Sequence, residues 1–303
     1  MVMAYNGMMM NELPKTLNEL DRNSVFETSA REAQTRLVHF DADVHKGIRG
    51  HAALVAGSSG MMGAALLALM AASRSGCGKI TAIAPANSSN LVHNTIPEAL
   101  FRNFENQSTL LNNYQSIGIG PGSGNSPALH AWIRKICLHG SPAVFDADSL
   151  NMLATDKSLF KQLPHESILT PHLGEWERLF GKSPNNISRI NTSIDICKSN
   201  NINILIKGRY SVLINSKGTL FINGTGNAGM AKAGSGDVLT GILTSLLAQG
   251  YSPESAGIVG MFIHGLAGDR AKDKTGEDGM KATDIIDSIP EAFKTLRKGI
   301  TFP

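Results

Sequence analysis

The sequence predicts an α/β fold with a doubly wound, mostly parallel sheet, helices on both faces and a β-hairpin near the C-terminal part. From His51 onward, short β-branched or apolar runs alternate with stretches of helical periodicity. This alternation is typical of parallel strands joined by crossover helices. The strand-like runs are almost continuously apolar, as expected for a sheet that is buried on both faces.

The alternating pattern assigns the parallel part of the sheet in chain order. Six strands are expected, at Ala52–Ala56, Ile80–Ala84, Ser116–Gly120, Ala143–Phe145, Ser167–Thr170 and Ile204–Lys207. Helices are expected at Gly63–Arg74, Pro127–His139, Leu173–Phe180 and Ile187–Ser199. Crossover segments of this length allow the chain to return before the next parallel strand.

The pattern changes after the last of these strands. Ser211–Ile214 and Thr219–Ile222 flank the turn-rich Asn215–Gly218, and this arrangement predicts a β-hairpin. A glycine-rich loop then leads into a helix near Ser235–Gln249, and a second helix follows near Pro253–Arg270. Both are rich in Gly, Ala, Ile and Leu, so we expect them to be buried against the sheet.

One domain is expected for most of the chain. Residues 1–44 are polar and weakly periodic, with a candidate helix only near Glu27–Val38, and they are expected to form an N-terminal extension. Residues 45–303 contain no repeat and no linker rich enough to divide them. We therefore expect them to form a single domain.

Composition excludes several classes of protein. The 303 residues carry 28 basic and 25 acidic side chains, a net charge of +3, which gives no electrostatic surface for nucleic acid. The longest nearly apolar run, Met61–Ala72, is shorter than the roughly 20 residues that cross a membrane. Cys77, Cys137 and Cys197 are widely spaced, which fits a reducing cytosol. Without a basic, apolar leader, a cytoplasmic protein is expected.

Ligands of an open parallel sheet bind beyond the carboxyl ends of its strands, so the segments that follow strands are the candidate site. Gly57–Gly63 has G-x-x-G-x-x-G spacing, which differs from the dinucleotide fingerprint G-x-G-x-x-G. Its amides at a helix start could still bind an anion or a carbonyl group. Gly120-Pro-Gly122 allows a ligand to approach the backbone closely, or is only a turn.

Carboxylates and a histidine follow the next two strands. Asp146 and Asp148 could hold a hydrated magnesium ion, although Asp148 is favoured as the cap of a helix beginning near Ser149. His172 lies in the Gly- and Pro-rich turn Thr170–Glu175. It is therefore better placed for ligand binding than most single histidines.

The strongest motif is the glycine-rich run Thr225–Asp237. Its four glycines leave backbone N–H groups free, and the start of the following helix adds its positive dipole end. Together they predict a cradle for the oxygens of a phosphoryl group. Asp237 lies at the helix start, where the dipole favours its ionised form and where it can act as a general base. A simple N-cap role would not explain the glycines.

An ordered set of motifs resembles the ADP/ATP-dependent NAD(P)H-hydrate dehydratases of the ribokinase-like superfamily. Gly234-Ser-Gly-Asp237 resembles the anion hole and catalytic base of ribokinase-like enzymes. The rest of the set comprises His45-Lys-Gly47 with Gly50-His51, Ala56-Gly-Ser58 with Met62-Gly-Ala-Ala65, Arg74-Ser-Gly-Cys-Gly78, Gly118-Ile-Gly-Pro-Gly122, Asp146-Ala-Asp-Ser-Leu-Asn151, Leu169-Thr-Pro-His-Leu-Gly-Glu175, Lys207-Gly208 and Asn227-Ala-Gly-Met-Ala231. The resemblance spans His45 to the C-terminus.

The resemblance implies a role for each matching position. The catalytic group would be Asp237, supported by the loop residues Gly234, Ser235 and Gly236. The hydrated nicotinamide nucleotide would contact Ala64, Gly122, His172 and Asp237. The adenine nucleotide would be held by Lys207, Gly208, Arg209, Tyr210, Ser211, Asn227, Gly229, Met230 and Gly236. Asp146 and Glu175 are candidate magnesium ligands through water, in a fold that often holds the ion mainly through phosphates.

The implied reaction repairs a hydrated cofactor. In NADHX or NADPHX, water has added to the reduced nicotinamide ring and left a hydroxyl group at C6. Asp237 would deprotonate this hydroxyl, which would attack the terminal phosphoryl group of ADP or ATP, with the loop amides and Mg²⁺ stabilising the transferred charge. Loss of phosphate would restore NADH or NADPH. The resemblance also implies a functional partner, NAD(P)H-hydrate epimerase, and a homo-oligomer, a tetramer.

Two alternatives use the same residues. A small-molecule kinase of this fold would phosphorylate a vitamin-precursor alcohol with the same base and anion hole, and would release the phosphoester. A nucleotide-binding sensor or scaffold would bind without catalysis, although Asp237, Lys207 and the glycines are all present. The motifs around Ala64 and His172 favour the dehydratase.

Overall fold

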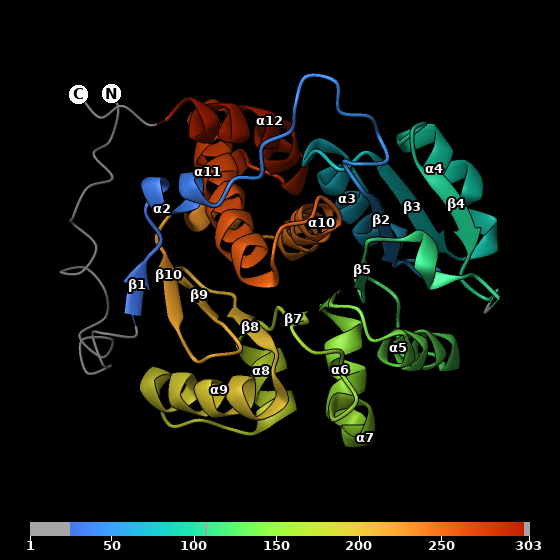
Figure 1. Cartoon of the computed structure of the whole chain (residues 1–303), viewed down its shortest axis with the longest axis horizontal. Coiled ribbons are helices and arrows are strands. Elements are labelled where there is room, and N and C mark those ends of the chain that lie inside the picture. The colour runs from blue at the N-terminus through green and yellow to red at the C-terminus, as the bar shows by residue number, and fades with distance from the viewer. Residues whose placement is uncertain (1–24, 107, 300–303) are drawn as a thin grey trace.

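The computed structural model describes residues 25–106 and 108–299, and in these residues ten strands form one sheet (Figure 1). The strands are β1 (Val25–Glu27), β2 (His51–Val55), β3 (Lys79–Ala84), β4 (Leu100–Asn103), β5 (Ser116–Ile119), β6 (Ala143–Phe145), β7 (Ile168–Leu169), β8 (Asn203–Ile206), β9 (Ser211–Ile214) and β10 (Leu220–Asn223). Their order is β1-β10-β9-β8-β7-β6-β5-β2-β3-β4. Only β9 runs antiparallel to its neighbours among these described strands.

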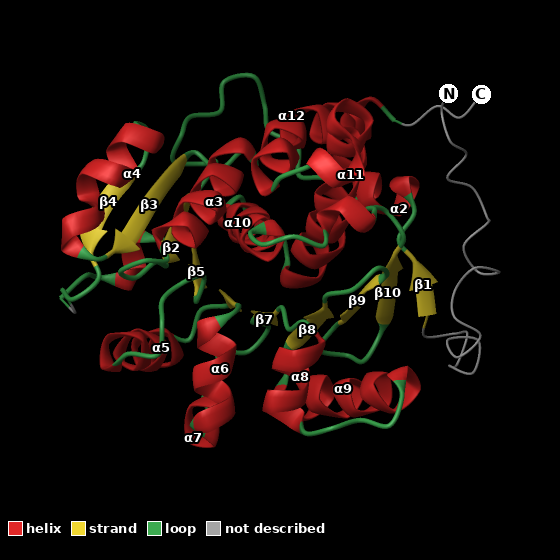
Figure 2. Cartoon of the chain, turned by 180° about the vertical axis from the view of Figure 1, so that it is seen from behind, coloured by secondary structure: helices red, strands yellow, loops and turns green. Residues whose placement is uncertain are grey.

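Helices cover both faces of the sheet (Figure 2). They are α2 (Ala30–Thr35), α3 (Met62–Arg74), α4 (Ser89–Thr95), α5 (Pro127–His139), α6 (Asp148–Thr155), α7 (Lys157–Phe160), α8 (Leu173–Phe180), α9 (Asn186–Asn200), α10 (Ser235–Ala248), α11 (Pro253–Gly279) and α12 (Ala282–Lys298). One layer contains α2, α3, α10, α11 and α12, and the opposite layer contains α5 to α9. In the described residues, no helix has the length and apolar character needed to span a membrane.

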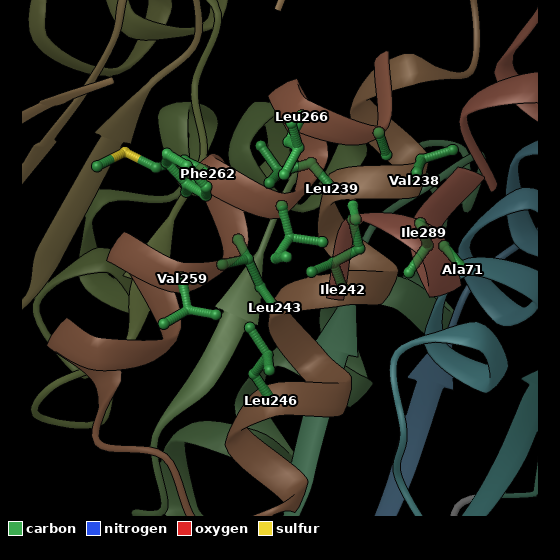
Figure 3. Packing of buried hydrophobic residues seen from close by; sticks show 14 of the residues in the cluster. Ala71, Val238, Leu239, Ile242, Leu243, Leu246, Val259, Phe262, Leu266 and Ile289 are labelled. Carbon is green, nitrogen blue, oxygen red and sulfur yellow. The ribbon is translucent and has the colours of Figure 1, made fainter. Parts of the chain in front are cut away.

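The apolar contact between α10 and its neighbours fixes the helix that leads out of the glycine-rich loop. Ile242, Leu243 and Leu246 of α10 interlock with Val259 and Phe262 of α11 (Figure 3). Each such buried side chain contributes about 1.5–3 kcal/mol relative to exposure. These contacts fix α10 against one face of the sheet. The position of its first turn therefore depends on the packing of the hydrophobic core.

A glycine allows α10 to approach α3 closely. A Cβ atom at Gly241 would lie 2.1 Å from the backbone oxygen of Ala68. Since no side chain fits in this space, the two helices meet backbone to backbone. Helices α3 and α10 are therefore packed directly against each other on the same face of the sheet.

The predicted α/β fold, its parallel strands and its hairpin are confirmed, with small shifts in the ends of elements. The strand expected at Ser167–Thr170 is shorter, Ile168–Leu169, and the helix expected near Pro253–Arg270 continues to Gly279. Strand β4 and helices α4, α7 and α12 had not been predicted. The alternating exposure of β4 explains its omission, because the strand has no continuous apolar run.

Part of the segment expected to be an N-terminal extension adds to the same sheet. Val25–Glu27 pairs in parallel with β10, and Phe26 stacks on Phe221 with ring centroids 5.7 Å apart. The helix expected near Glu27–Val38 is present as Ala30–Thr35. Residues 1–24 lie outside the described residues, and the division between 1–44 and 45–303 stays a prediction.

Candidate active site

Backbone hydrogen bonds bring the predicted loops together at the carboxyl edge of the sheet. The amide of Gly57, after β2, donates to the carbonyl oxygen of Pro121, after β5, at 2.8 Å. Further along the same edge, the amide of Lys207 donates to the carbonyl oxygen of Pro171 at 2.9 Å. Loops that are far apart in the sequence therefore form one continuous surface.

The helix α10 begins in this surface with uncapped amides. Gly234 is its N-cap, in a left-handed conformation with φ of 93°, and it provides no side-chain cap. A Cβ atom there would lie 2.5 Å from Leu67, so both the backbone conformation and the space favour glycine. The Ser235 amide donates to the Lys232 carbonyl oxygen at 3.4 Å, and no side chain caps the helix start, so anion binding by the amides of this turn stays a prediction.

Asp237 is held at this helix start in a partly buried, acidic environment. Burial, followed by the negative charge of Asp146, raises the pKa of Asp237 to about 7, and the charge of Lys207 opposes this rise. The helix dipole was expected to favour the ionised form of Asp237, but desolvation and the neighbouring carboxylates outweigh it and raise the pKa. A carboxylate with a pKa of about 7 is well matched to a general base at neutral pH.

A buried ion pair between Lys207 and Asp146 lies near Asp237. The carboxylate of Asp146 accepts a hydrogen bond from Lys207 Nζ at 2.6 Å and another from Thr240 Oγ1 at 2.7 Å. Glu175 Oε2 lies 3.6 Å from the same Lys207 Nζ. Burial alone would lower the pKa of Lys207, but the charges of Asp146 and Glu175 outweigh burial and raise it. Lys207 is therefore a fixed positive charge at the floor of the site.

The two candidate magnesium ligands are already engaged by protein groups. Asp146 binds Lys207 and Thr240 through its two oxygens, and Glu175 accepts a hydrogen bond from the His172 amide at 2.8 Å. Within residues 25–106 and 108–299, no group of three or more His, Cys, Asp or Glu side chains could hold a metal ion. The donor set therefore does not fit a magnesium site made by the protein alone.

Asp148 has a different role from the predicted one. Helix α6 begins at Asp148 itself, with Ala147 at the N-cap position and no side-chain cap. Asp148 Oδ2 instead accepts a hydrogen bond from the Gly124 amide at 2.8 Å. This bond ties the loop after β5 to α6, so Asp148 stabilises the wall of the site and does not cap its helix.

Ala64 and Gly122, predicted to contact the hydrated nucleotide, lie against one another. Gly122 has φ of 59°, and a Cβ atom there would lie 2.6 Å from the Met61 oxygen and 3.0 Å from Ala64 Cβ. His172 caps α8 through Nδ1, which accepts from the amides of Gly174 and Glu175. Half of its side chain is exposed. Its Nε2 lies 3.3 Å from Glu175 Oε1, so the histidine is a structural cap whose ring is half exposed.

The predicted nucleotide residues lie in two loops at the antiparallel end of the sheet. In the turn after β8, the Arg209 guanidinium lies over the Tyr210 ring, 5.0 Å from its centroid. Arg209 also donates to the carbonyl oxygen of Gly224, 3.3 Å away, and so links this turn to the loop after β10. In that loop, Asn227 Oδ1 accepts from the Gly229 amide and caps the 3₁₀ turn Ala228–Met230.

Three residues near the site had not been predicted from the sequence. Thr240 donates a hydrogen bond to Asp146. The sequence could have indicated Thr240, because it lies three residues after Asp237 and therefore on the same side of the helix. His264 Nε2 lies 3.3 Å from Ser235 Oγ, and burial lowers the pKa of His264 to about 4, so the ring is neutral. Asp269 binds the loop that contains Asn227. No pattern marked His264 or Asp269, because their contacts are made across helices.

This arrangement is a ribokinase-like α/β fold. A ribokinase-like superfamily protein from Enterococcus faecalis shares the fold with a TM-score of 0.82 and 24% identity, over 93% of this chain and 99% of that chain. The ADP/ATP-dependent NAD(P)H-hydrate dehydratase from Bacillus subtilis, co-crystallised with ATP/Mg²⁺, has a TM-score of 0.82 and 29% identity, over 91% of this chain and 100% of that chain.

Sequence comparison identifies the family. The family model for NAD(P)H-hydrate dehydratase matches residues 52–291, so the chain belongs to this family. The ADP-dependent (S)-NAD(P)H-hydrate dehydratase of Neisseria meningitidis is 34% identical, over 86% of this chain and 88% of that protein. A bifunctional NAD(P)H-hydrate repair enzyme of Moorella thermoacetica is also 34% identical, over 90% of this chain. The chain spans about half the length of the bifunctional relatives that it matches.

Proposed function

We propose that the protein uses ADP or ATP to dehydrate (S)-NADHX and (S)-NADPHX to NADH and NADPH, with release of phosphate. The observation that carries this proposal is Asp237, a carboxylate with a pKa of about 7 at the uncapped start of α10. The family match supports the choice of substrate. The ATP in the Bacillus subtilis structure supports the choice of nucleotide.

The site residues divide the reaction between them. Asp237 takes the proton from the C6 hydroxyl, and the resulting oxygen attacks the terminal phosphoryl group of the nucleotide. AMP leaves when ADP is the donor, or ADP when ATP is the donor, and the backbone amides of Ala233 to Gly236 stabilise the charge on the transferred group. The lone pair of the ring nitrogen then expels phosphate. This leaves an iminium ion, and loss of a proton from C5 to the released phosphate or to solvent restores the ring double bond. The proton taken from C6–OH remains on Asp237 until it exchanges with solvent.

The remaining roles follow from the family resemblance. Ala64, Gly122 and His172 hold the hydrated nucleotide beside Asp237, and the loops Lys207–Ser211 and Asn227–Met230 hold the adenine nucleotide. Mg²⁺ would be bound mainly through the phosphates of the nucleotide and through water, because Asp146 and Glu175 are engaged by the protein. When bound, the ion supplies charge neutralisation at the phosphates.

The cellular setting is also proposed. The protein acts in the cytoplasm, as a homotetramer, and NAD(P)H-hydrate epimerase supplies it with the reactive epimer. The bifunctional relatives support this partner, because about half of their length lies outside the match to this chain. Separation by size with light scattering would test the tetramer.

The deciding experiment adds the protein to chemically prepared NADH hydrate with Mg²⁺ and either ADP or ATP. We expect the near-ultraviolet absorbance of the reduced nicotinamide ring to return, only with nucleotide and with one phosphate released per ring restored. The faster of the two reactions identifies the phosphoryl donor. No recovery with folded protein would contradict the proposal, and a stable phosphorylated product from a small alcohol would establish the kinase alternative.

A further inference from the structure

One carboxylate of α11 organises the loop that follows β10. Asp269 Oδ2 accepts a hydrogen bond from the Gly226 amide at 3.0 Å, and Asp269 Oδ1 accepts one from Asn227 Nδ2 at 3.0 Å. Two consecutive residues of the loop are therefore fixed by the two oxygens of a single side chain. The proposed reaction at Asp237 does not use Asp269.

Asp269 also determines which way the Asn227 amide points. An ionised carboxylate only accepts hydrogen bonds, so the NH₂ group of Asn227 must face it. The oxygen of Asn227 is then directed to the Gly229 amide, which it binds at 3.0 Å. The capped turn Ala228–Met230 thus depends on the carboxylate that orients its cap.

The surface of α11 is shaped to receive this loop. A Cβ atom at Gly265 would lie 2.1 Å from Thr225 Oγ1, and one at Gly268 would lie 2.2 Å from Met230 Sδ. The Thr225 hydroxyl donates to the carbonyl oxygen of Phe262 on the same helix, at 3.2 Å. Gly265, Gly268 and Asp269 form one surface of α11, which we call the loop seat.

We propose that the loop seat holds Thr225–Met230 in the shape that binds the adenine nucleotide, and that Asp269 is a positioning residue for nucleotide binding. This inference rests on the proposed function only in that the loop's ligand is a nucleoside di- or triphosphate. It assigns Asp269 no part in the chemical step, which takes place at Asp237.

Replacing Asp269 with asparagine gives a sharp test, because Asn has nearly the same shape but one acceptor and one donor. Its oxygen can satisfy either the Gly226 amide or the Asn227 NH₂ group, and its own NH₂ group then faces the other N–H donor. Either the Gly226 amide loses its acceptor, or Asn227 must flip or lose its partner and Gly229 loses its cap. Asp273→Asn is the matched control, since Asp273 is an exposed residue one turn further along α11 and the change in charge is identical.

The measurements are the Kd of ADP by titration calorimetry and the steady-state constants for NADH hydrate. For Asp269→Asn we expect the Kd and KM of ADP to rise about tenfold. The kcat at saturating ADP and the KM of the hydrate should stay within about twofold of wild type, because the reacting groups are untouched. Asp273→Asn should match wild type throughout.

The outcomes separate this inference from the proposed function. An unchanged Kd for ADP in folded Asp269→Asn, or a loss of kcat with KM unchanged, overturns the role of Asp269. Wild-type protein that binds ADP but does not restore NADH contradicts the proposed function, while the change in Kd still decides the inference. Wild-type protein that binds no nucleotide overturns both. If Asp269→Asn does not fold, Gly268→Ala tests the same seat by displacing Met230, with the same expected rise in Kd.

Discussion

The two ends of the sheet build the site in different ways. At the parallel end, each strand is followed by a helix, so the loops at the carboxyl edge come from distant parts of the chain and supply single residues such as Gly122, Asp146 and His172. At the antiparallel end, β9 runs opposite to β8 and β10. The turn between β8 and β9 and the loop after β10 therefore lie at the same carboxyl edge of the sheet. Two neighbouring loops there supply a contiguous set of residues.

In the proposed function, this difference corresponds to the two substrates. The hydrated nucleotide is assigned to the dispersed residues of the parallel end, and the adenine nucleotide to the two loops of the antiparallel end. Charge follows the same division, since Asp146, Asp148 and Glu175 belong to the parallel end and Lys207 and Arg209 to the antiparallel end. The start of α10 lies where the two ends meet, with Gly236 close to both Lys207 and Asp146.

The largest effect is expected where the two ends meet. Asp237→Asn removes the base and should lower kcat by about 10²–10⁴-fold, because proton removal from the C6 hydroxyl is lost. ADP should bind as in wild type, which calorimetry checks. The base assignment is wrong if this variant keeps more than a few per cent of wild-type turnover.

The next largest effect is expected on stability, and it tests whether Lys207 of the antiparallel end forms a stabilising ion pair with Asp146 of the parallel end. Lys207→Met leaves Asp146 buried without its ion-pair partner and should lower the free energy of unfolding by about 3–5 kcal/mol. Urea unfolding measures this loss. Lys217→Met, at an exposed lysine in the hairpin turn, should change little.

A double variant checks the cause of the Lys207→Met effect. Lys207→Met combined with Asp146→Asn removes both charges of the ion pair and should be more stable than Lys207→Met alone, because Asp146 then no longer leaves a buried charge without its partner. Equal stability of the single and double variants would contradict the ion-pair interpretation.

The carboxylates of the parallel end predict a pH dependence. Asp237 must be ionised to accept a proton, so kcat/KM should fall about tenfold per pH unit below pH of about 7 and level off above it. Asp146→Asn removes a negative charge that raises this pKa and should move the midpoint to lower pH. A midpoint that does not move in Asp146→Asn would assign the titration to another group.

The same shift predicts how Asp237 affects stability. Its folded-state pKa lies above the value of about 4 in an unfolded chain, so the folded state binds more protons between these values. The contribution of Asp237 to stability is therefore present at low pH and is lost as the pH rises from about 4 to about 7. Urea unfolding of Asp237→Asn should lack this decline.

The smallest effect concerns the parallel end alone. Gly122→Ala places a Cβ atom on a left-handed residue, 2.6 Å from the Met61 oxygen, and should raise the KM of the hydrate about tenfold. The KM of ADP should not change. Gly140→Ala is the control, because Gly140 also has a positive φ but no atom within 4 Å of its added Cβ. If both KM values rose together, the two substrates would not be bound by separate ends.

The sequence predicted elements well where their pattern was strong. The continuous apolar runs identified the buried parallel strands, and the glycine-rich loop before Asp237 identified the start of α10. The edge strand β4 was missed because its residues alternate between exposed and half-buried. Helix α12 was missed although its buried residues repeat at helical spacing, and Pro290 inside it weakens that pattern.

The sequence by itself determined the doubly wound sheet, the hairpin and the family motifs, because each depends on periodicity or on residues adjacent in the chain. Only the tertiary structure decided that Asp237 has a raised pKa, because the burial and the neighbouring carboxylates that raise it come from other parts of the chain. It also decided that Asp146 binds Lys207 and Thr240, and that Asp269 orients Asn227. Charge interactions and hydrogen bonds act across space, and the distances that govern them exist only after the chain has folded.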